Sequence, residues 1–383
     1  MRYQLTCFGL LLFLTNTVYS NILSIPNQET ETPTSPSKQA SKPTNTDPKF
    51  NKDNIFLRAT AIYGIMDDGG LSSSAFVQSL TGSGQAQNYM PNLNPGLGYQ
   101  LELGYKLDPN GAHLAILSYA SLTTSGTTAV NASSGGTLFN NFTQFGDVPE
   151  GTDTGFHVLH GPATATANLK YAYDSLIFQS QRPYSDDGGT TIKFSHSLGM
   201  RYLHLTKDFE GLYSGLVTDD TTKLLITSQD SINYNAVYQG LGGLIAADAS
   251  WRPTKRLVIK GGGAATMLAG IYTSTFNETA SAAGPVLILT NNPALSSYSD
   301  TEIHNVQAWI PAIFEANVSV LYNIIAPKPQ RASLSIEGGY YLESILPLIS
   351  SDAVSQNLGT TLAKLNNNLN ISSVFITLSW KLH

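Results

Sequence analysis

The stretch LELGYKLDPNGAHLAILSY, residues 101–119, contains the pattern that decides the fold. One side of its first half carries Leu101, Leu103, Tyr105 and Leu107, and the other side carries Glu102, Gly104 and Lys106. The run Asp-Pro-Asn-Gly at 108–111 then breaks the pattern before a second extended segment begins. Because successive side chains of a strand point to opposite faces of a sheet, the stretch predicts two strands joined by a turn.

The same period of two recurs from residue 54 onward. Its apolar sides are Ile55, Leu57, Ala59, Ala61, Tyr63 and Ile65; Ala165, Ala167, Leu169, Tyr171 and Tyr173; Ile192, Phe194, Leu198, Met200 and Tyr202; Ala316, Val318, Val320, Tyr322 and Ile324; Leu334, Ile336, Tyr340 and Leu342; and Val374, Ile376, Leu378, Trp380 and Leu382. Strands of soluble sheets average about 5–6 residues, whereas a strand that crosses a bilayer needs about 9–11. The long runs, with polar residues opposite, favour a membrane barrel with its apolar side in lipid, although a soluble sandwich alternates too.

The connections supply a second signal. We predict an antiparallel up-and-down barrel of ten strands near 54–66, 96–107, 112–122, 164–180, 190–207, 228–250, 255–273, 303–325, 331–345 and 371–382. Long segments rich in Gly, Ser, Thr and Asn alternate with short turns that contain proline, as in outer-membrane barrels with long outer loops and short periplasmic turns. An even strand count returns both termini to the periplasm. The segment 123–163 leaves open two more strands, which would give twelve.

Glycine-rich positions interrupt this pattern twice. The apolar side changes phase between Tyr234/Ala236/Tyr238 and Leu241/Ile245, which predicts a β-bulge at the intervening glycines. The run Gly-Gly-Gly at 261–263 predicts a sharp bend in the strand or the close approach of a plug segment.

The N-terminal part is expected to lie outside the barrel. Residues 1–20 have a basic start, a short apolar run and small residues before a cleavage site after Ser20, which predicts a secretory signal peptide. Residues 21–53 are polar and proline-rich and predict a disordered periplasmic tether, and 54–383 form the barrel. Cys7, the single cysteine, lies inside the signal, so the mature chain has no cysteine chemistry.

Composition and motifs exclude several kinds of function. Lys and Arg total 21 against 27 Asp and Glu, so the chain lacks the basic surface that nucleic acid requires. His157 and His160 form a weak metal motif without a third ligand, and acidic pairs such as Asp67-Asp68 adjoin turn formers. No GxSxG, HExxH or P-loop sequence occurs. We therefore predict no catalytic residues, no metal site, no cofactor and no enzyme activity.

The residues with most functional interest are charges on the side opposite the apolar one. We predict that they face the lumen: Arg58, Glu102, Lys106, Lys170, Asp174, Lys193, Arg201, Lys260, Glu315, Glu337, Glu343 and Lys381. Such charges set ion preference if they ring an open pore. Alternatively they pair with one another and fill the lumen, because about eight strands give a filled interior and ten lie near that end of the range.

Three segments resemble the major outer membrane protein family of Legionella and relatives such as Coxiella. They are LGMRYLHLTKDFE (198–210), YQGLGGLIAADASWRPTKRLVIKGGGAATMLAG (238–270) and LSIEGGYYLESI (334–345). The resemblance spans most of the mature chain. It consists of the general pattern of barrel strands and turns more than of one unique motif. It implies an outer-membrane β-barrel with porin-like, pore-forming activity.

Two functions remain open at this point. One is passive transport of ions or small solutes through a porin-like barrel in the bacterial outer membrane. The other is a closed barrel that serves as a structural or surface-recognition protein, with its long loops contacting a host or surface ligand. Either would place the chain among outer-membrane lipid and lipopolysaccharide, assembled by the barrel-assembly machinery. The oligomeric state is not predicted.

Overall fold

The structure is a computed structural model that describes residues 55–67, 76–80, 86–89, 91, 93–107, 113–140, 158–183, 192–218, 225–283, 297–325, 333–351 and 365–381. Within these residues the chain is built from strands, and no helix there is long and apolar enough to cross a membrane. The strands are β1 (Ile55–Asp67), β2 (Val77–Leu80), β3 (Ala86–Tyr89), β4 (Gly96–Lys106), β5 (Leu114–Ala132), β6 (Thr137–Asn140), β7 (Val158–Pro183), β8 (Ile192–Thr218), β9 (Leu225–Trp251), β10 (Leu257–Ala283), β11 (Ser297–Trp309), β12 (Ala312–Ile325), β13 (Ser333–Ser351) and β14 (Leu365–Lys381). The predicted signal peptide, its cleavage site after Ser20 and the predicted tether lie outside the described residues.

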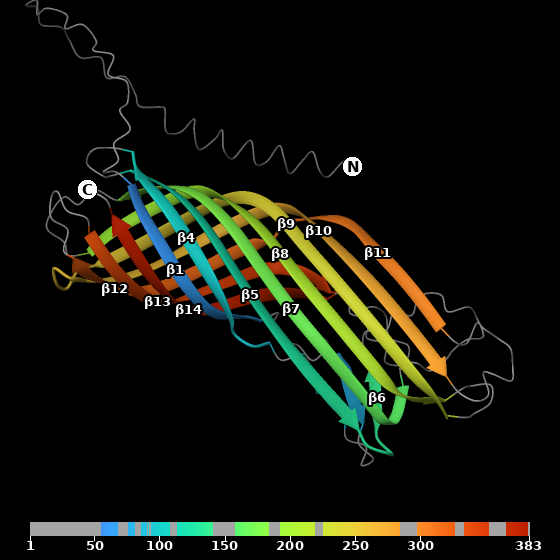
Figure 1. Ribbon diagram of the computed structural model, residues 1–383. Helices are drawn as coiled ribbons and strands as arrows, with labels where there is room; N and C mark the ends of the chain where they lie inside the picture. Colours follow the sequence, from blue (N-terminus) through green and yellow to red (C-terminus); the bar gives the residue numbers. More distant parts are fainter. Residues whose placement is uncertain are drawn as a thin grey trace, which may run out of the picture. The chain divides into compact units, whose positions relative to one another are not determined.

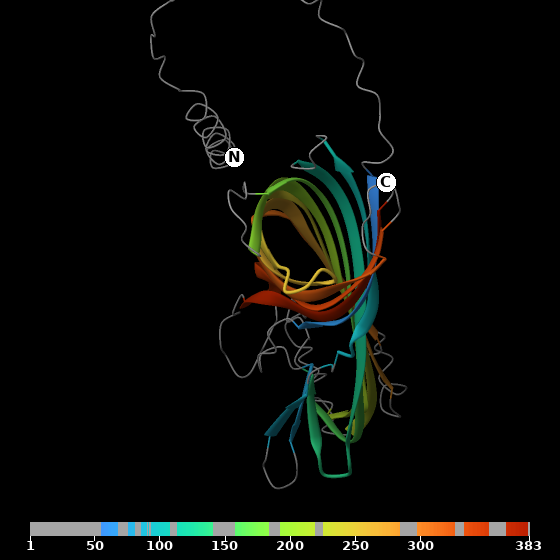
Figure 2. The ribbon, with the colours of Figure 1, turned by 90° about the vertical axis from the view of Figure 1, so that its left-hand side faces the viewer.

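Ten of the strands close into an antiparallel barrel, as predicted (Figures 1 and 2). Their order around the ring is β7-β5-β4-β1-β14-β13-β12-β10-β9-β8, and pairing of β7 with β8 closes it. The first strand, β1, pairs with the last, β14, from Phe56 with Lys381 to Asp67 with Asn370. Closure leaves no unpaired barrel edge, which is the only way for a sheet to satisfy its backbone in hydrocarbon.

A band of apolar side chains covers the outside of this ring. Every second residue is exposed in the runs predicted to face lipid, for example Leu97, Leu101, Leu198, Met200 and Ile376, which are 79%, 54%, 62%, 52% and 60% exposed. We call this surface the outer band. The apolar side of the stretch LELGYKL, residues 101–107, belongs to this outer band.

The polarity of the sheet inverts beyond the outer band. In β8 the outward residues Ile192–Tyr202 are mostly apolar and are followed by outward His204, Thr206 and Asp208, whereas the inward side changes from Lys193 to Arg201 into buried Leu203 and Leu205. Strands β5, β7, β9 and β10 invert in the same way. We call the part of the barrel wall beyond the band the extension, and the opposite end, where β9 meets β10, the turn end. An apolar interior and a polar outside are what a water-exposed fold requires.

This inversion corrects one predicted lipid face. Ala165, Ala167, Leu169, Tyr171 and Tyr173 are buried in the interior of the barrel wall, with exposed fractions of 0%, 1%, 6%, 0% and 6%. Their neighbours on the other face of β7, including Asn168, are exposed. The predicted period of two is correct, but the apolar residues lie on the inner face of the wall and not on the lipid face. The reason is that this part of β7 belongs to the extension.

The inversion also explains the phase change that suggested a bulge. Strand β9 pairs with β8 and β10 without a register shift through Gly240–Gly243, so there is no bulge at these glycines. Tyr238 points inward and Leu241 outward, because the apolar side of the same regular strand changes at this level. Gly240 and Gly270 face each other across the pair, and a Cβ on either would lie 2.1 Å or 2.6 Å from the Tyr238 hydroxyl, so the tyrosine requires glycine at both.

The second glycine run is equally regular. Strand β10 pairs with β9 and β12 through Gly261, Gly262 and Gly263 without interruption. The predicted bend is therefore absent from these described residues. The alternative prediction, the close approach of a plug segment, is not met among the described residues either: the group nearest an added Cβ at Gly262 is Asp248 Oδ1 of the paired strand β9, at 2.2 Å.

The extension replaces segments that were predicted as loops. The described residues of the segment 123–163 belong mainly to β5, β7 and the short strand β6 and include no further barrel strand, and the described residues of the segment 208–227 belong to β8 and β9. The predicted strand 303–325 is divided at Pro311 into β11, which pairs with the far half of β10, and β12, which pairs with its near half. Proline has no N–H for the ladder, while its carbonyl accepts a bond from Leu268 N at 3.0 Å.

A small sheet of β3, β2 and β6 covers part of the inner face of the extension (Figure 2). Phe76 and Val77 are both 0% exposed. The ring of Phe76 lies 6.3 Å from that of Tyr213 on β8, and the Tyr213 hydroxyl donates to the Phe76 carbonyl at 3.0 Å. The extension thus has a hydrophobic core of its own, which continues into the barrel.

Candidate functional site

Nine of the predicted lumen charges lie on the inward side of their strands. They are Arg58, Glu102, Lys106, Lys193, Arg201, Lys260, Glu315, Glu337 and Glu343. The side chain of Lys381 lies outside the described residues. Two predictions are wrong: Lys170 and Asp174 point away from the lumen, because β7 alternates in phase with exposed Leu176 and Phe178. Asp174 instead accepts a hydrogen bond from the outward Tyr119 hydroxyl at 2.7 Å and lies 3.7 Å from His204 Nδ1.

The most buried cation among the inward charges is Arg201. Its side chain is 1% exposed, and its Nη2 lies 2.8 Å from Oε2 of Glu343, whose side chain is 0% exposed. Its Nη1 forms a second ion pair with Glu315. Nε donates to Ser175 Oγ at 3.0 Å, and Nη2 also donates to the Tyr173 hydroxyl. A guanidinium presents its donors in a planar fork, so a single arginine can hold both carboxylates in place.

These contacts reach across the interior of the barrel. Arg201 is on β8, whereas Glu315 and Glu343 are on β12 and β13, and β9 and β10 lie between them in the ring. Tyr173 on β7 donates to Glu343 Oε2 at 3.0 Å, and Tyr341 on β13 donates to the same oxygen. We call these five side chains the lumen cluster. They link opposite parts of the barrel wall, across the interior, at the level where the polarity of the wall inverts.

Arg201 is the only cation that an ion pair joins to these two carboxylates within the described part of the chain. Glu315 and Glu343 are directly opposite each other on adjacent strands. Like charges in that position repel, and burial strengthens the repulsion. The guanidinium therefore offsets the repulsion between β12 and β13 at this level.

A second tier of charges lies nearer the turn end. Lys260 Nζ is 2.6 Å from Glu337 Oε2, and Arg58 Nη1 is 2.9 Å from Glu102 Oε1. Ser319 also donates to Glu337. These pairs are more exposed than the lumen cluster, with the side chains of Lys260 and Arg58 exposed by 27% and 36%. The lumen is thus polar and partly accessible near the turn end.

The interior on the other side of the lumen cluster is mainly apolar, although Lys207 and the buried Asp230 also point into it. The inward residues there include the following buried side chains: Leu203, Leu205, Phe209, Tyr171, Tyr238, Leu268, Ile313, Ile345, Leu369 and Ile371. They belong to one contiguous hydrophobic core. A solvated ion that passes the cluster would meet this core, where an unpaired charge is strongly disfavoured.

The chemistry of these sites is charge pairing. No group of three His, Cys, Asp or Glu side chains that could hold a metal ion occurs among the described residues, and His157 lies outside them. Sequence reasoning missed the two tyrosines and Ser175 of the Arg201 contacts. Tyr173 was assigned to lipid because the period of two does not say which face is inside. The continuation of β7 far beyond the length of a bilayer crossing was the signal against that assignment.

Comparison with known proteins identifies the relatives of the chain. Residues 49–382 match the sequence profile of a family described as Legionella pneumophila major outer membrane protein precursor. No curated protein matches the sequence. Among solved structures, the outer membrane protease OmpT of Escherichia coli is similar with a TM-score of 0.36 and 11% identity, over 88% of this chain and 99% of that chain. A FadL homologue of Pseudomonas aeruginosa has a TM-score of 0.25 and 9% identity, over 86% and 91%.

Proposed function

The chain belongs to the Legionella pneumophila major outer membrane protein family, and from this premise we propose that it is a closed outer-membrane barrel that presents its extension as a structural or recognition surface. The lumen cluster is the observation that carries the proposal. A buried guanidinium joins carboxylates on distant strands, and an apolar core follows it. A water-filled path would need the side chains of the lumen cluster to separate and the side chains of the apolar core to move aside. The proposal assigns no catalysis to the chain.

In the proposed orientation the turn end and both termini face the periplasm, and the extension faces the outside of the cell. The polar outer surface of the extension supports this choice, because a wall that leaves the bilayer must be compatible with water. The one described turn-end connection, residues 252–256, is short, as periplasmic turns are. The extension would emerge among lipopolysaccharide.

Planar-bilayer recording tests the closed state. We expect the refolded protein to give no single-channel steps, because the lumen cluster crosses the interior and a mainly apolar core lies beyond it. Regular conductance steps from the unmodified protein would overturn the closed-barrel proposal. A variant with Arg201 replaced by Ala serves as a comparison, since it removes the side chain that crosses the lumen.

Passive passage of ions or small solutes is the second candidate. The polar, partly exposed ion pairs Lys260–Glu337 and Arg58–Glu102 favour it, as does the pore-forming activity that the family resemblance implies. It requires the lumen cluster to open. If the unmodified protein conducts, Lys260→Glu should shift its ion preference toward cations, because fixed charges near the path set selectivity. An unchanged preference would place the path elsewhere.

A recognition role is tested on the extension itself. Replacing 133–157 by a short Gly-Ser linker removes β6 and its contacts with β2 but leaves the ten barrel strands. We expect bacteria that display this variant to adhere less to host-cell monolayers than bacteria with the unmodified barrel, at equal surface amounts. Equal adhesion would reject recognition through this part of the extension.

A further inference from the structure

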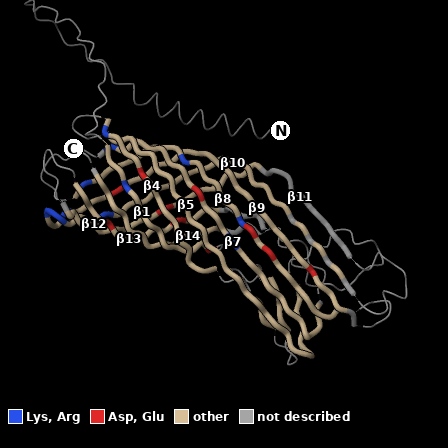
Figure 3. The backbone as a smooth tube through the Cα atoms, viewed as in Figure 1, with Lys and Arg blue, Asp and Glu red and all other residues tan. Residues whose placement is uncertain are grey.

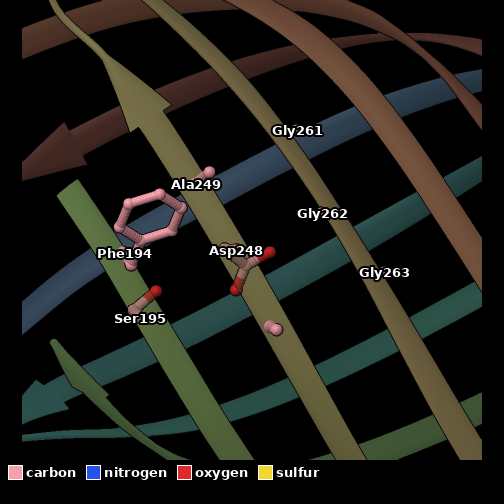
Figure 4. Close-up of a pocket in the computed structure, with 8 residues that line it drawn as sticks. Phe194, Ser195, Asp248, Ala249, Gly261, Gly262 and Gly263 are labelled. Atoms are coloured by element: carbon pink, nitrogen blue, oxygen red, sulfur yellow. The ribbon is translucent and has the colours of Figure 1, made fainter. Parts of the chain in front are cut away.

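A depression in the outer band lies close to the turn end, across β8, β9 and β10 (Figure 4). It has a volume of about 510 Å³, within the range of about 300–1,000 Å³ that ligand pockets occupy. Its lining consists of Phe194, Ala247, Ala249, Gly261 and Gly263, which point outward, and of Ser195, Asp248 and Gly262, which alternate to the inner face of the same wall. Small side chains therefore leave the outer surface hollow where the rest of the band is bulky.

The register explains the shape of this depression. Phe194, Ala249, Gly261 and Val318 occupy consecutive strands in one row, so two large side chains flank two small ones. Phe194 and Val318 are 55% and 54% exposed and form the walls. The next outward row toward the turn end contains Trp251, which is 45% exposed. A tryptophan at the end of an apolar band is typical of the level of lipid headgroups.

Positive charge adjoins the depression on the same side. The turn 252–256 contains Arg252, Lys255 and Arg256 but no Asp or Glu. Arg252 and Lys255 are exposed and form no ion pair with any described carboxylate. Arg256 donates to the hydroxyl of the outward Tyr322 at 3.3 Å, which holds this cation on the outer side of the turn. Figure 3 shows Lys and Arg gathered at this end of the barrel.

The turn that carries these cations is ordered by its own side chain. Thr254 Oγ1 accepts hydrogen bonds from the backbone N–H groups of Arg256 and Leu257 at 3.3 Å and 3.1 Å. Arg252 follows Ala249 by three residues, which in an extended strand is about 10 Å. A phosphate at the turn and an acyl chain in the depression would thus belong to one lipid molecule.

We propose that this depression and the basic turn Arg252–Arg256 form a binding site for one anionic phospholipid. The acyl chain lies against Ala249 and Gly261, and the phosphate lies between Arg252 and Lys255. Basic side chains beside a membrane-crossing segment attract anionic headgroups by about 1 kcal/mol each. The assignment to the periplasmic leaflet depends on the proposed orientation, whereas the chemistry of the lipid does not.

Native mass spectrometry of the purified full-length barrel tests the charge requirement. The probes are phosphatidylglycerol, phosphatidylcholine and lipid A, each added at equal concentration. We expect one retained phosphatidylglycerol and weaker retention of the other two. The variant Arg252→Gln with Lys255→Gln should retain about thirtyfold less phosphatidylglycerol. Equal retention of phosphatidylcholine, preference for lipid A, or no effect of the variant would overturn the proposal.

A matched pair of glycine substitutions tests the depression. Gly261 and Gly338 both point outward in the band, and a Cβ on either would have its nearest neighbour at 3.7 Å or 3.8 Å, so both sites accept a side chain. Gly261→Leu fills the depression and should lower phosphatidylglycerol retention by about tenfold, as expected if two methylene groups lose their contact. Gly338→Leu should retain the lipid as the unmodified protein does.

Equal behaviour of the two leucine variants would overturn the proposal. A dimer that Gly261→Leu disrupts, without bound lipid, would overturn it as well and identify a second copy of the chain as the occupant. None of these measurements depends on whether the lumen conducts. Their failure is therefore distinguishable from failure of the closed-barrel proposal.

Discussion

The outer band and the extension are built from the same strands and have opposite polarity. In β8 the outward side chain is apolar at Met200 and charged at Asp208, whereas the inward one is charged at Arg201 and apolar at Phe209. The backbone pairing is continuous through both regions. The comparison shows that one uninterrupted sheet can be compatible with lipid in one region and with water in another. This requires the apolar side chains to change from the outer to the inner face at the boundary. Regular geometry alone does not reveal where that boundary lies.

The largest expected effect concerns the interior at the boundary. Arg201→Met leaves Glu315 and Glu343 buried without their cation, and breaking a buried ion pair costs about 3–5 kcal/mol. Urea unfolding in phospholipid vesicles should show this loss in the free energy of unfolding. Replacing all three side chains together, with Met and two Gln, should recover most of it. If the single substitution were neutral, the lumen cluster would contribute nothing to the fold.

The interior of the extension should behave like the core of a soluble protein. Leu203 is 0% exposed, and Leu203→Ala should destabilise by about 2–5 kcal/mol, since it leaves a cavity. Leu212 lies on the outer face of the same strand and is 45% exposed. Leu212→Ala should stay within about 0.5 kcal/mol. Similar losses for both, in the same urea titrations, would mean that the extension has no separate inside and outside.

The outer faces of the two regions should differ in their response to charge. Met200→Arg places a cation against lipid and should cost about 2–4 kcal/mol. Leu212→Arg, twelve residues further on the same face, lies in the extension and should cost less than about 0.5 kcal/mol. The stability difference between the two variants in vesicles measures the polarity boundary directly. Equal costs would place Met200 and Leu212 in the same solvent.

The smallest effect is expected at the outer edge of the band. Tyr119→Phe removes the 2.7 Å hydrogen bond to Asp174 and should cost about 1 kcal/mol. Tyr99 has its ring centroid 6.0 Å from that of Tyr119 but no hydrogen bond within the described residues, so Tyr99→Phe is the matched control. Thermal unfolding in detergent micelles should separate the two. A control as costly as the test would show that the rings, not the bond, matter.

The sequence was sufficient to predict the barrel and its outer band but not the extension. Alternation at Leu97–Leu107 and Ala316–Ile324 identified both strands and their lipid faces, because there the apolar side is the outer one. At Ala165–Tyr173 the same alternation has the opposite meaning, since a period of two is identical whether the apolar face meets lipid or a core. The change of phase between Tyr238 and Leu241 was the visible trace of the boundary, and it was interpreted as a bulge.

The candidate site was predictable in its charges but not in its contacts. Arg201, Glu315 and Glu343 follow from their positions opposite apolar residues. Their meeting depends on which strands face each other across a closed ring, and that follows from three-dimensional curvature rather than from any local pattern. Lys170 and Asp174 were wrongly assigned to the lumen because the apolar side of β7 next to them was assigned to lipid.

The length of β8 determines which part of the protein an approaching particle contacts first at the cell surface. From Tyr202 the strand continues to Thr218, and at about 3.3 Å per residue this continuation is about 50 Å long. In the proposed orientation an approaching antibody or bacteriophage would touch the far rim of this wall well before it reached the bilayer. Immune pressure would then fall on outward residues such as Glu210 and Asn233, which can vary freely, while the buried leucines beneath them stay fixed.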